Sequence, residues 1–215
     1  RVNISLDSLD ADKFKRITRG GELDRVWRGI AAAAAAQCAP LKLNTVIVRG
    51  LNAAELPAFT RLTVEHAWHV RFIEVMPIGN TQDWGTGFPA PGERYISVQE
   101  MRADLSTFNL QPETAPVGNG PARTFRIPGA LGTIGFISPL SEHFCQSCNR
   151  LRLTSDGKLR SCLVIPNEVS LRDAVRSGQP LEKYFFHAIA NKPEHHDMLV
   201  AVPASSQRGM SQIGG

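Results

Sequence analysis

Apolar and polar residues alternate in three segments near the start of the chain, and segments with helical spacing of apolar residues lie between them. The alternation predicts strands, and the helical spacing predicts helices. The expected strands are residues 1–6, 41–48 and 69–79, and the expected helices are residues 10–37, broken at Gly20 and Gly21, and residues 53–67. Strands that alternate with helices in this way indicate a parallel α/β unit. Three such repeats make half of a barrel or part of a doubly wound sheet, and they are too few to close a barrel of eight strands.

The pattern changes after residue 79, where a loop rich in Gly and Pro begins. Short strands separated by tight turns follow, and Asp156-Gly157 supplies the positive φ that a hairpin turn needs. The later strands are expected at residues 123–128, 132–138 and 150–163, and the later helices at residues 97–107, 171–178 and 181–191. We therefore predict an α/β unit over residues 1–79 and a smaller α+β part over residues 80–215, whose antiparallel sheet carries the cysteines.

Composition narrows the class of protein. The 215 residues, 42% of them hydrophobic, suffice for one sizeable core or for a core with a smaller appended unit. No apolar run reaches about 18 residues, so we expect no membrane-spanning segment. The net charge of +4 is mild and the basic residues are scattered except near the cysteines, which favours local anion sites over a nucleic-acid stripe. Four cysteines in a chain of this length do not make a disulfide framework, so we expect a reducing, cytoplasmic compartment.

Three of the cysteines are clustered in a metal-binding pattern. Cys145 and Cys148 form a C-x2-C pair, and Cys162 returns beside them across the expected hairpin. Three unrelated buried cysteines are one interpretation. Structural zinc is a second, and it needs a fourth ligand such as His143 or Cys38. An iron–sulfur cluster is the third: a 4Fe–4S cube has one thiolate per iron, so three cysteines leave one iron open to a substrate atom.

Basic residues flank the cysteines. Arg150 and Arg152 alternate along the first strand of the hairpin, and Lys158 and Arg160 return on its partner. Guanidinium groups offer fixed forks of donors for carbonyl or phosphate oxygens. The alternative interpretation is a basic strand that is simply solvated.

Together, several segments resemble a known family. They are "RVNISLDSLD", "LKLNTVIVRGLN", "VRFIEVMPIG", "FCQSCNRLRLTSDGKLRSCL" and the terminal "IGG". In this order they resemble the radical-SAM GTP 3′,8-cyclases, the A proteins of molybdenum cofactor biosynthesis, over nearly the whole chain. The resemblance implies the C-terminal two-thirds of such an enzyme: a partial radical-SAM (βα) barrel of about three units, followed by an α+β part with a three-cysteine 4Fe–4S cluster.

The resemblance also implies a reaction. Family members use S-adenosylmethionine at an N-terminal 4Fe–4S cluster to form a 5′-deoxyadenosyl radical, and they convert GTP to 3′,8-cyclo-7,8-dihydro-GTP. The guanine binds the open iron of the C-terminal cluster, and the product passes to a partner enzyme that forms cyclic pyranopterin monophosphate. The resemblance leaves open whether the chain forms a homodimer.

Individual residues match positions with roles in this family. The matches are Ser5 and Met76 for S-adenosylmethionine; Lys42 and Arg71 for the GTP phosphates; Arg150, Leu151 and Arg152 for GTP beside the cluster; Cys145, Cys148 and Cys162 for the cluster; and Gly214 and Gly215 for a tail that enters the active site. Simpler roles exist for some of them. Met76 could be a core residue, Ser5 a helix cap and Lys42 a solvated lysine. Arg71 lies in an apolar strand, where burial without a partner would be costly, so function is favoured there.

One part of the family pattern is missing. The chain has no C-x3-C-x2-C motif, since only Cys38 precedes Cys145, and it opens at Arg1 within a strand pattern. We therefore expect a truncated sequence, or an N-terminal part on a separate chain, so that this chain binds GTP and one cluster but does not cleave S-adenosylmethionine. The exposed edge of the first strand predicts poor solubility or partial disorder for the chain expressed alone.

Two other functions stay open on the sequence. Another radical-SAM enzyme with an auxiliary cluster, such as a peptide-modifying maturase, would usually carry more cysteines in the auxiliary part and would have no use for the Gly-Gly end. A zinc-stabilised binding module without catalysis would have a fourth protein ligand at the cysteines and would not bind guanine nucleotides.

Overall fold

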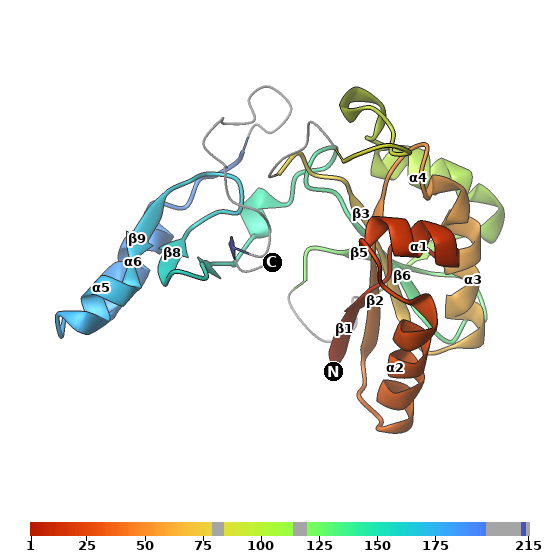
Figure 1. The fold of residues 1–215 in the computed structure, drawn as a ribbon, viewed down its shortest axis with the longest axis horizontal. Helices are drawn as coiled ribbons and strands as arrows, with labels where there is room; N and C mark the ends of the chain where they lie inside the picture. Colours follow the sequence, from red (N-terminus) through yellow and green to blue (C-terminus); the bar gives the residue numbers. More distant parts are fainter. Residues whose placement is uncertain (79–83, 114–119, 197–211, 214–215) are drawn as a thin grey trace. The chain divides into compact units, whose positions relative to one another are not determined.

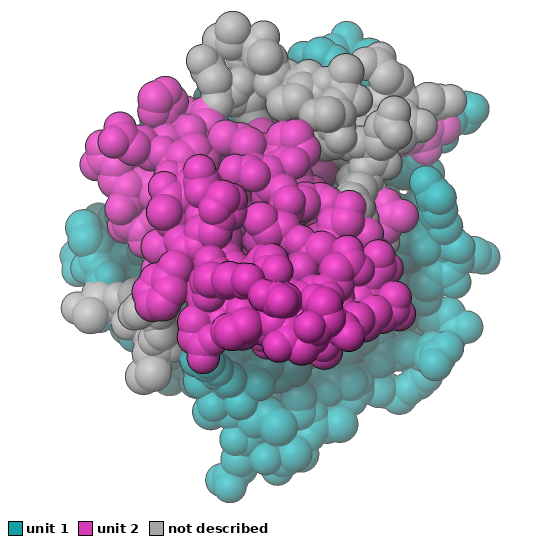
Figure 2. Space-filling model, turned by 90° about the vertical axis from the view of Figure 1, so that its left-hand side faces the viewer, with its two compact units in different colours: residues 1–75, 86–142 teal, residues 76–85, 143–215 magenta. Residues whose placement is uncertain are grey.

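The computed structural model describes residues 1–78, 84–113, 120–196 and 212–213. The chain forms two compact units, residues 1–75 with 86–142 and residues 76–85 with 143–215, coloured separately in Figure 2. Residues 86–142 therefore pack with the first unit, whereas the sequence pattern assigned everything after residue 79 to the second.

The first unit is built on a six-stranded sheet with the order β1-β2-β3-β6-β5-β4. Its strands are β1 (Val2–Ser5), β2 (Leu41–Ile47), β3 (His69–Glu74), β4 (Gln111–Pro112), β5 (Arg123–Arg126) and β6 (Thr133–Ile137). The parallel pairing of β1, β2 and β3 agrees with the βα spacing of the sequence. Within the described residues the sheet is open, with β1 at one edge and β4 at the other.

Strand β6 corrects the expected topology. We predicted it in the antiparallel part, but it pairs in parallel with β3 and antiparallel with β5. A parallel pair needs a long crossover, which the segment containing helix α4 (Val98–Asp104) supplies. Thr133, Ile134, Gly135 and Phe136 are all buried, as in a central strand covered on both faces. The result is a mixed α/β sheet.

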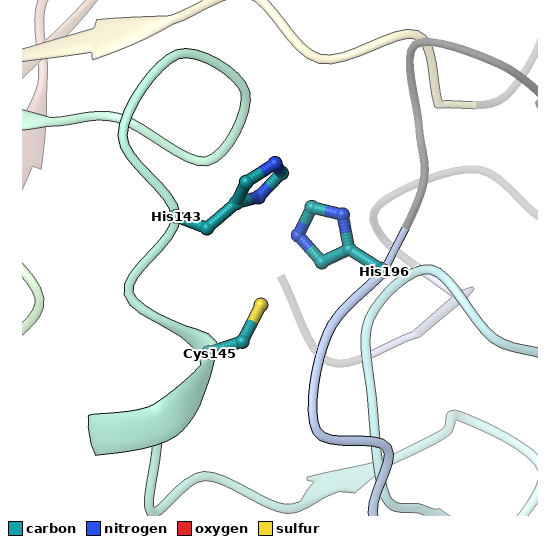
Figure 3. A group of neighbouring side chains, drawn as sticks. All are labelled: His143, Cys145 and His196. Atoms are coloured by element: carbon teal, nitrogen blue, oxygen red, sulfur yellow. The ribbon is translucent and has the colours of Figure 1, made fainter.

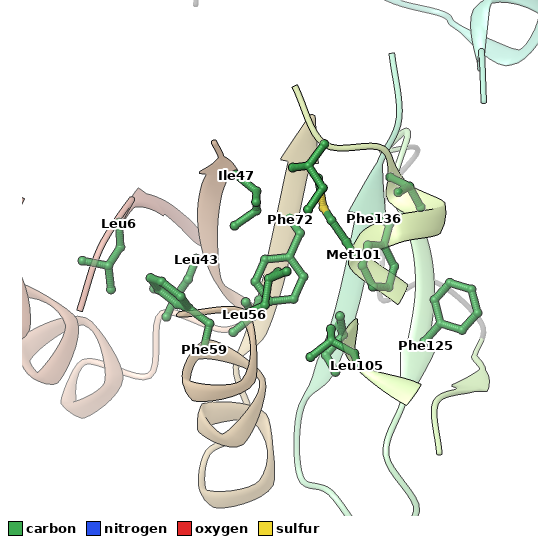
Figure 4. Packing of buried hydrophobic residues seen from close by; sticks show 14 of the residues in the cluster. Leu6, Leu43, Ile47, Leu56, Phe59, Phe72, Met101, Leu105, Phe125 and Phe136 are labelled. Atoms are coloured by element: carbon green, nitrogen blue, oxygen red, sulfur yellow. The ribbon is translucent and has the colours of Figure 1, made fainter. Parts of the chain in front are cut away.

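The helices of the first unit lie along one face of the sheet (Figure 1). They are α1 (Ala11–Ile17), α2 (Leu23–Ala35), α3 (Leu56–Glu65) and α4, with 3-10 turns η1 (Ala53–Glu55), η2 (Pro91–Glu93) and η3 (Ser106–Phe108). The predicted break between α1 and α2 is confirmed, and Gly20 adopts a φ of 115° there. The core between helices and sheet is largely aliphatic and contains a group of aromatic rings: the ring centroid of Phe72 lies 6.4 Å from that of Phe59 and 5.8 Å from that of Phe136 (Figure 4).

A buried carboxylate ties the parts of this unit together. Glu74, at the end of β3, is fully buried. It accepts hydrogen bonds from the backbone N–H groups of Val98 (2.9 Å), Leu140 (2.9 Å) and Ser141 (3.0 Å), and from the Ser141 hydroxyl. The Tyr95 hydroxyl also donates to it at 3.3 Å. Because these donors lie at the start of α4 and in the turn after β6, Glu74 joins both segments to the end of β3.

The second unit is smaller and antiparallel, as predicted. It contains strands β7 (Arg152–Leu153), β8 (Lys158–Arg160) and β9 (Glu168–Ser170), a 3-10 turn η4 (Cys145–Ser147), and helices α5 (Leu171–Arg176) and α6 (Glu182–Ala190). Gly157 has a φ of 80° in the β7–β8 turn, as the Asp-Gly signal predicted. Its core is small, with Leu159, Leu171 and Ala188 buried. In the described parts of both units, no helix has the length and apolar character needed to cross a membrane.

Candidate functional site

The three clustered cysteines belong to the second unit and are half-buried free thiols. Cys145 begins η4, and the backbone N–H of Cys148 donates to the Cys145 carbonyl at 3.0 Å, which closes this turn. Cys162 follows the end of β8, so the hairpin returns the chain toward the turn. The local structure thus places the C-x2-C pair on one segment and the third thiol on another.

The thiols act on one another electrostatically. Burial raises the pKa of Cys145, and the neighbouring Cys162 and Cys148 raise it further. The backbone N–H of His196 and the Lys192 ammonium act in the opposite direction. Thiolates that destabilise one another in a half-buried site are stabilised by a bound metal, because metal binding releases the thiol protons. This donor set fits an iron–sulfur cluster with three protein ligands, and it equally fits a zinc ion that has one further ligand.

Lys192 connects the two segments that carry these thiols. Its Nζ donates to the carbonyl of Arg150 and to the carbonyl of Ser161, both at 2.8 Å. Arg150 lies two residues after Cys148, and Ser161 directly precedes Cys162. The ammonium therefore holds the C-x2-C segment and the end of β8 together. Nothing in the local sequence pattern marks this lysine, because it lies beyond α6.

Two histidines lie beside Cys145. His143 and His196 have ring centroids 5.0 Å apart in a T-shaped arrangement. Their ring nitrogens and the Cys145 sulfur lie within 4.8 Å of one another (Figure 3). His143 was considered as a ligand from the sequence, whereas His196 was missed because it lies far from the cysteines along the chain. Cys38 belongs to the first unit, three residues after the end of α2.

The basic residues of the hairpin divide into two groups. Arg150 is exposed and precedes β7, so the strand alternation that we predicted begins only at Arg152. Burial lowers the pKa of Arg152, with Arg150 acting in the same direction and Cys162 and Cys148 opposing it. The cysteines therefore lie within electrostatic range of Arg152. Leu151 is half-buried and its side chain packs against the small core of the unit.

Lys158 and Arg160, on the partner strand, have structural contacts instead. Lys158 pairs with Glu168 at 3.2 Å. Arg160 is almost fully buried, pairs with Glu168 at 3.6 Å and donates to the Ile165 carbonyl at 3.1 Å. Glu168 on β9 and Asp156 in the turn, 3.9 Å from the Lys158 ammonium, together balance these two cations, so this strand is not simply a solvated basic strand.

A second group of predicted residues lies on the sheet of the first unit. Strand register defines two rows across the parallel strands, which we call the polar sheet face. The rows are Asn3, Lys42, His69 and Thr133, and Ser5, Asn44, Arg71 and Gly135. Neighbouring positions such as Leu41, Leu43, Val70 and Phe72 belong to the core. Alternation on a pleated strand thus separates the core from a row of polar groups.

The polar sheet face is electropositive. Burial lowers the pKa of Lys42, and the cations Arg71 and Arg1 lower it further. Burial likewise lowers the pKa of His69, with Lys42, Arg126 and Arg71 acting in the same direction. The Arg71 guanidinium donates to Asn3 Oδ1 at 2.8 Å, and His69 Nδ1 lies 2.7 Å from the Thr133 hydroxyl. Perturbed pKa values caused by burial and neighbouring like charges are typical of functional sites, so this face is a candidate site.

Gly135 makes room for the arginine on this face. A Cβ atom at position 135 would lie 3.1 Å from Arg71 Cγ and 3.1 Å from the Ala122 Cβ. These contacts are tighter than a side chain normally tolerates, so glycine allows the arginine stem to cross the neighbouring strand. The signal was present in the sequence as a glycine within an apolar strand, a pattern that indicates close approach of another group.

The remaining predicted residues are placed less directly. Ser5 is exposed at the end of β1 and is not a helix cap, since Asp10 Oδ1 accepts from the backbone N–H of Lys13 at 2.9 Å and caps α1. Met76 is half-buried two residues after β3 and belongs to the second unit, so it is not a residue of the first unit's core. Gly214 and Gly215 lie outside the described residues.

The fold and sites define a class of protein: a mixed α/β unit with an electropositive sheet face, joined to a small antiparallel unit with a candidate cysteine metal centre. Residues 68–198 match the family model Molybdenum Cofactor Synthesis C, and the chain belongs to this family. It is 46% identical to a GTP 3′,8-cyclase of Pelotomaculum thermopropionicum, 45% identical to one of Moorella thermoacetica and 43% identical to one of Listeria monocytogenes. Each comparison covers the whole chain and 65% of the relative.

Proposed function

We propose that this chain is the GTP-binding, C-terminal portion of a GTP 3′,8-cyclase, which catalyses the first step of molybdenum cofactor biosynthesis. The main support from the structure is the polar sheet face. Lys42 and Arg71 are held near one another although each disfavours the charge of the other. A triphosphate would relieve this repulsion through charge-assisted hydrogen bonds, and the guanidinium fork of Arg71 suits phosphate oxygens. Asn3 and His69 hold hydrogen bonds that orient this face.

In the second unit, we propose that Cys145, Cys148 and Cys162 hold a 4Fe–4S cluster. A cluster with three protein thiolates supplies one open iron, and guanine is the ligand proposed for it. The chain's own contribution is to position the nucleotide. Arg150 is exposed and Arg152 lies within electrostatic range of the thiols, so both are suited to donate to nucleotide oxygens. Leu151 contributes through its backbone.

We propose that the rest of the activity comes from residues outside this chain, on the same polypeptide or on a separate one. We propose that the first unit is part of a radical-SAM barrel, in which Ser5 and Met76 contact S-adenosylmethionine bound at a second 4Fe–4S cluster outside this chain. Gly214 and Gly215 are proposed to enter the active site, where glycines allow close approach of the backbone. The product would pass, in the cytoplasm, to the enzyme that forms cyclic pyranopterin monophosphate. A homodimer is compatible with this proposal.

Anaerobic reconstitution tests the cluster and the nucleotide together. Iron, sulfide and zinc are measured first, and EPR spectra of the reduced protein are then recorded with and without GTP. The proposal predicts four irons per chain and a spectrum that changes with GTP but not with CTP, which has the same triphosphate but lacks guanine. Cys162→Ser should abolish cluster uptake, whereas Cys38→Ser should not. Stoichiometric zinc with no cluster uptake and no response to GTP would contradict the proposal and favour a binding module.

A further inference from the structure

His143, Cys145 and His196 form a group of metal-ligand atoms that the proposed cluster does not use in full. The two imidazoles and the thiol offer two nitrogens and one sulfur, all within 4.8 Å of one another (Figure 3). A zinc ion with bonds of about 2.0–2.3 Å holds its ligand atoms roughly 3.5 Å apart, so these side chains need to close by only about 1 Å. Nitrogen and sulfur donors in a tetrahedral arrangement are the set that Zn²⁺ prefers.

Separate structural features bring the three ligands together. His143 and Cys145 come from one short segment, with Cys145 at the start of η4. His196 arrives from the segment after α6, which is anchored where Lys192 donates to the Arg150 and Ser161 carbonyls. The backbone N–H of His196 also lies close enough to Cys145 to lower the pKa of its thiol. Both the backbone and the ring of His196 therefore lie against Cys145, so the approach does not depend on one rotamer.

We infer that His143, Cys145 and His196 form a mononuclear Zn²⁺ site, with solvent as the fourth ligand, that is occupied when no cluster is present. Because Cys145 belongs both to this site and to the three-cysteine set, zinc and the cluster exclude one another. The chain thus has two metal states that share one thiolate. Zinc in the cluster-free state also protects the Cys145 thiolate from oxidation until a cluster is assembled. The zinc site itself does not depend on the proposed cyclase function.

The two ligand sets can be separated by substitution. His143→Ala and His196→Ala each remove a zinc ligand and leave all three cysteines intact. The double variant C148S/C162S removes two cluster ligands and leaves the zinc site intact. His195→Ala is the matched control, because His195 is the exposed neighbour of His196 and is absent from the group. Circular dichroism confirms that each variant folds, and His196→Asn replaces His196→Ala if the alanine variant does not.

The measurement is Zn²⁺ and Co²⁺ titration of the 215-residue chain, purified anaerobically without cluster. Co²⁺ reports thiolate and tetrahedral coordination through its absorption bands. We expect one Zn²⁺ per chain, binding that is weakened about 100-fold or more by either histidine substitution, and binding that is retained in C148S/C162S and in His195→Ala. Cluster reconstitution should show the opposite pattern, being lost in C148S/C162S and retained in both histidine variants.

Two results would overturn the inference. If zinc binding survives both histidine substitutions and is lost in C148S/C162S, the ion is held by the three cysteines. If the wild-type chain binds no Zn²⁺ in the absence of cluster, the three side chains are neighbours without a metal role. A chain that binds zinc as expected, but takes up no cluster and shows no response to GTP, would contradict the proposed function. The inference of a zinc site would still hold.

Discussion

The polar sheet face of the first unit and the thiol site of the second are positioned by different means. On the sheet face, strand pairing sets the position of each residue, and Lys42, His69 and Arg71 lie on a sheet whose other face is covered by a large core. In the second unit, Cys145, Cys148 and Cys162 lie on turns and strand ends that side chains such as Lys192 connect, over a small core. A site on a large sheet is preorganised by the fold, whereas a site on a small unit depends on its ligand for stability.

The largest expected effect concerns the first unit alone. Glu74→Ala leaves the buried N–H groups of Val98, Leu140 and Ser141 without their acceptor, and it should lower the free energy of unfolding of this unit by about 3–5 kcal/mol. Hydrogen exchange by mass spectrometry should show faster exchange in residues 1–75 and 86–142. Glu113→Ala, which breaks a half-exposed pair with Arg126, is the control and should cost less than about 1 kcal/mol. An equal decrease in the free energy of unfolding in both variants would mean that Glu74 does not hold these segments together.

Metal loading should act on the second unit. At free Zn²⁺ about 100-fold above its Kd, binding should raise the free energy of opening of residues 143–196 by about 2.7 kcal/mol and leave the first unit unchanged. Hydrogen exchange before and after chelation checks this under reducing, anaerobic conditions. A uniform change over both units would remove the contrast between a preorganised and a ligand-stabilised site.

Lys192 tests how the thiol site is held without metal. Lys192→Met removes the bonds to the Arg150 and Ser161 carbonyls, and it should destabilise the second unit by about 1–2 kcal/mol because these bonds are partly solvated. It should also slow cluster or zinc uptake, since the two cysteine segments are no longer joined. Lys183→Met is the control, because the described contacts of the Lys183 ammonium, a bond to Gln179 and a position over the Tyr184 ring, join no cysteine segment. Identical uptake by both variants would contradict this role.

Substitution of Lys42 distinguishes a role in anion binding from a role in the stability of the first unit. Lys42→Gln should weaken the binding of tripolyphosphate and of GTP about tenfold, or about 1.4 kcal/mol. It should not lower the free energy of unfolding, because it removes a cation that lies near Arg71 and Arg1. Calorimetric titration and urea unfolding measure the two effects. The exposed Lys15→Gln should change neither, and a Lys42 variant that loses stability but not affinity would show a structural role.

The smallest effect is the pH dependence contributed by His69. Burial and nearby cations lower the pKa of His69 below its ordinary value of 6.5, so the unfolded chain binds more protons in the window below 6.5. Stability should therefore fall as the pH falls through this window, and His69→Gln should make the fall less steep. Urea unfolding at several pH values checks the slope. Tripolyphosphate should raise the pKa of His69 in NMR titrations, and an unchanged pKa would place the anion elsewhere.

The local sequence pattern was sufficient to predict the strands at the start of the chain and the hairpin that precedes Cys162. The alternation in residues 41–48 and 69–79 predicted parallel strands, although β3 ends at Glu74, where the chain turns toward the second unit. The same alternation placed Lys42 on the face opposite the core, whereas the register of β2 and β3 shows that Arg71 shares this face. The position of β6 was not predictable from alternation, because a short apolar strand does not specify which neighbour it will join. That choice follows from the crossover through α4 and from burial on both faces.

By itself, the sequence determined most strands and helices, the spacing of Cys145, Cys148 and Cys162, and the resemblance that identified the family, but it did not indicate the short strands β4 and β9. These properties depend on residues that are close together along the chain. The tertiary structure decided that Glu168 neutralises Arg160, that Lys192 joins the cysteine segments, and that His196 lies against Cys145. Such contacts join residues from distant segments, and they form only when the packing of a unit offsets the entropy of closing the chain between them.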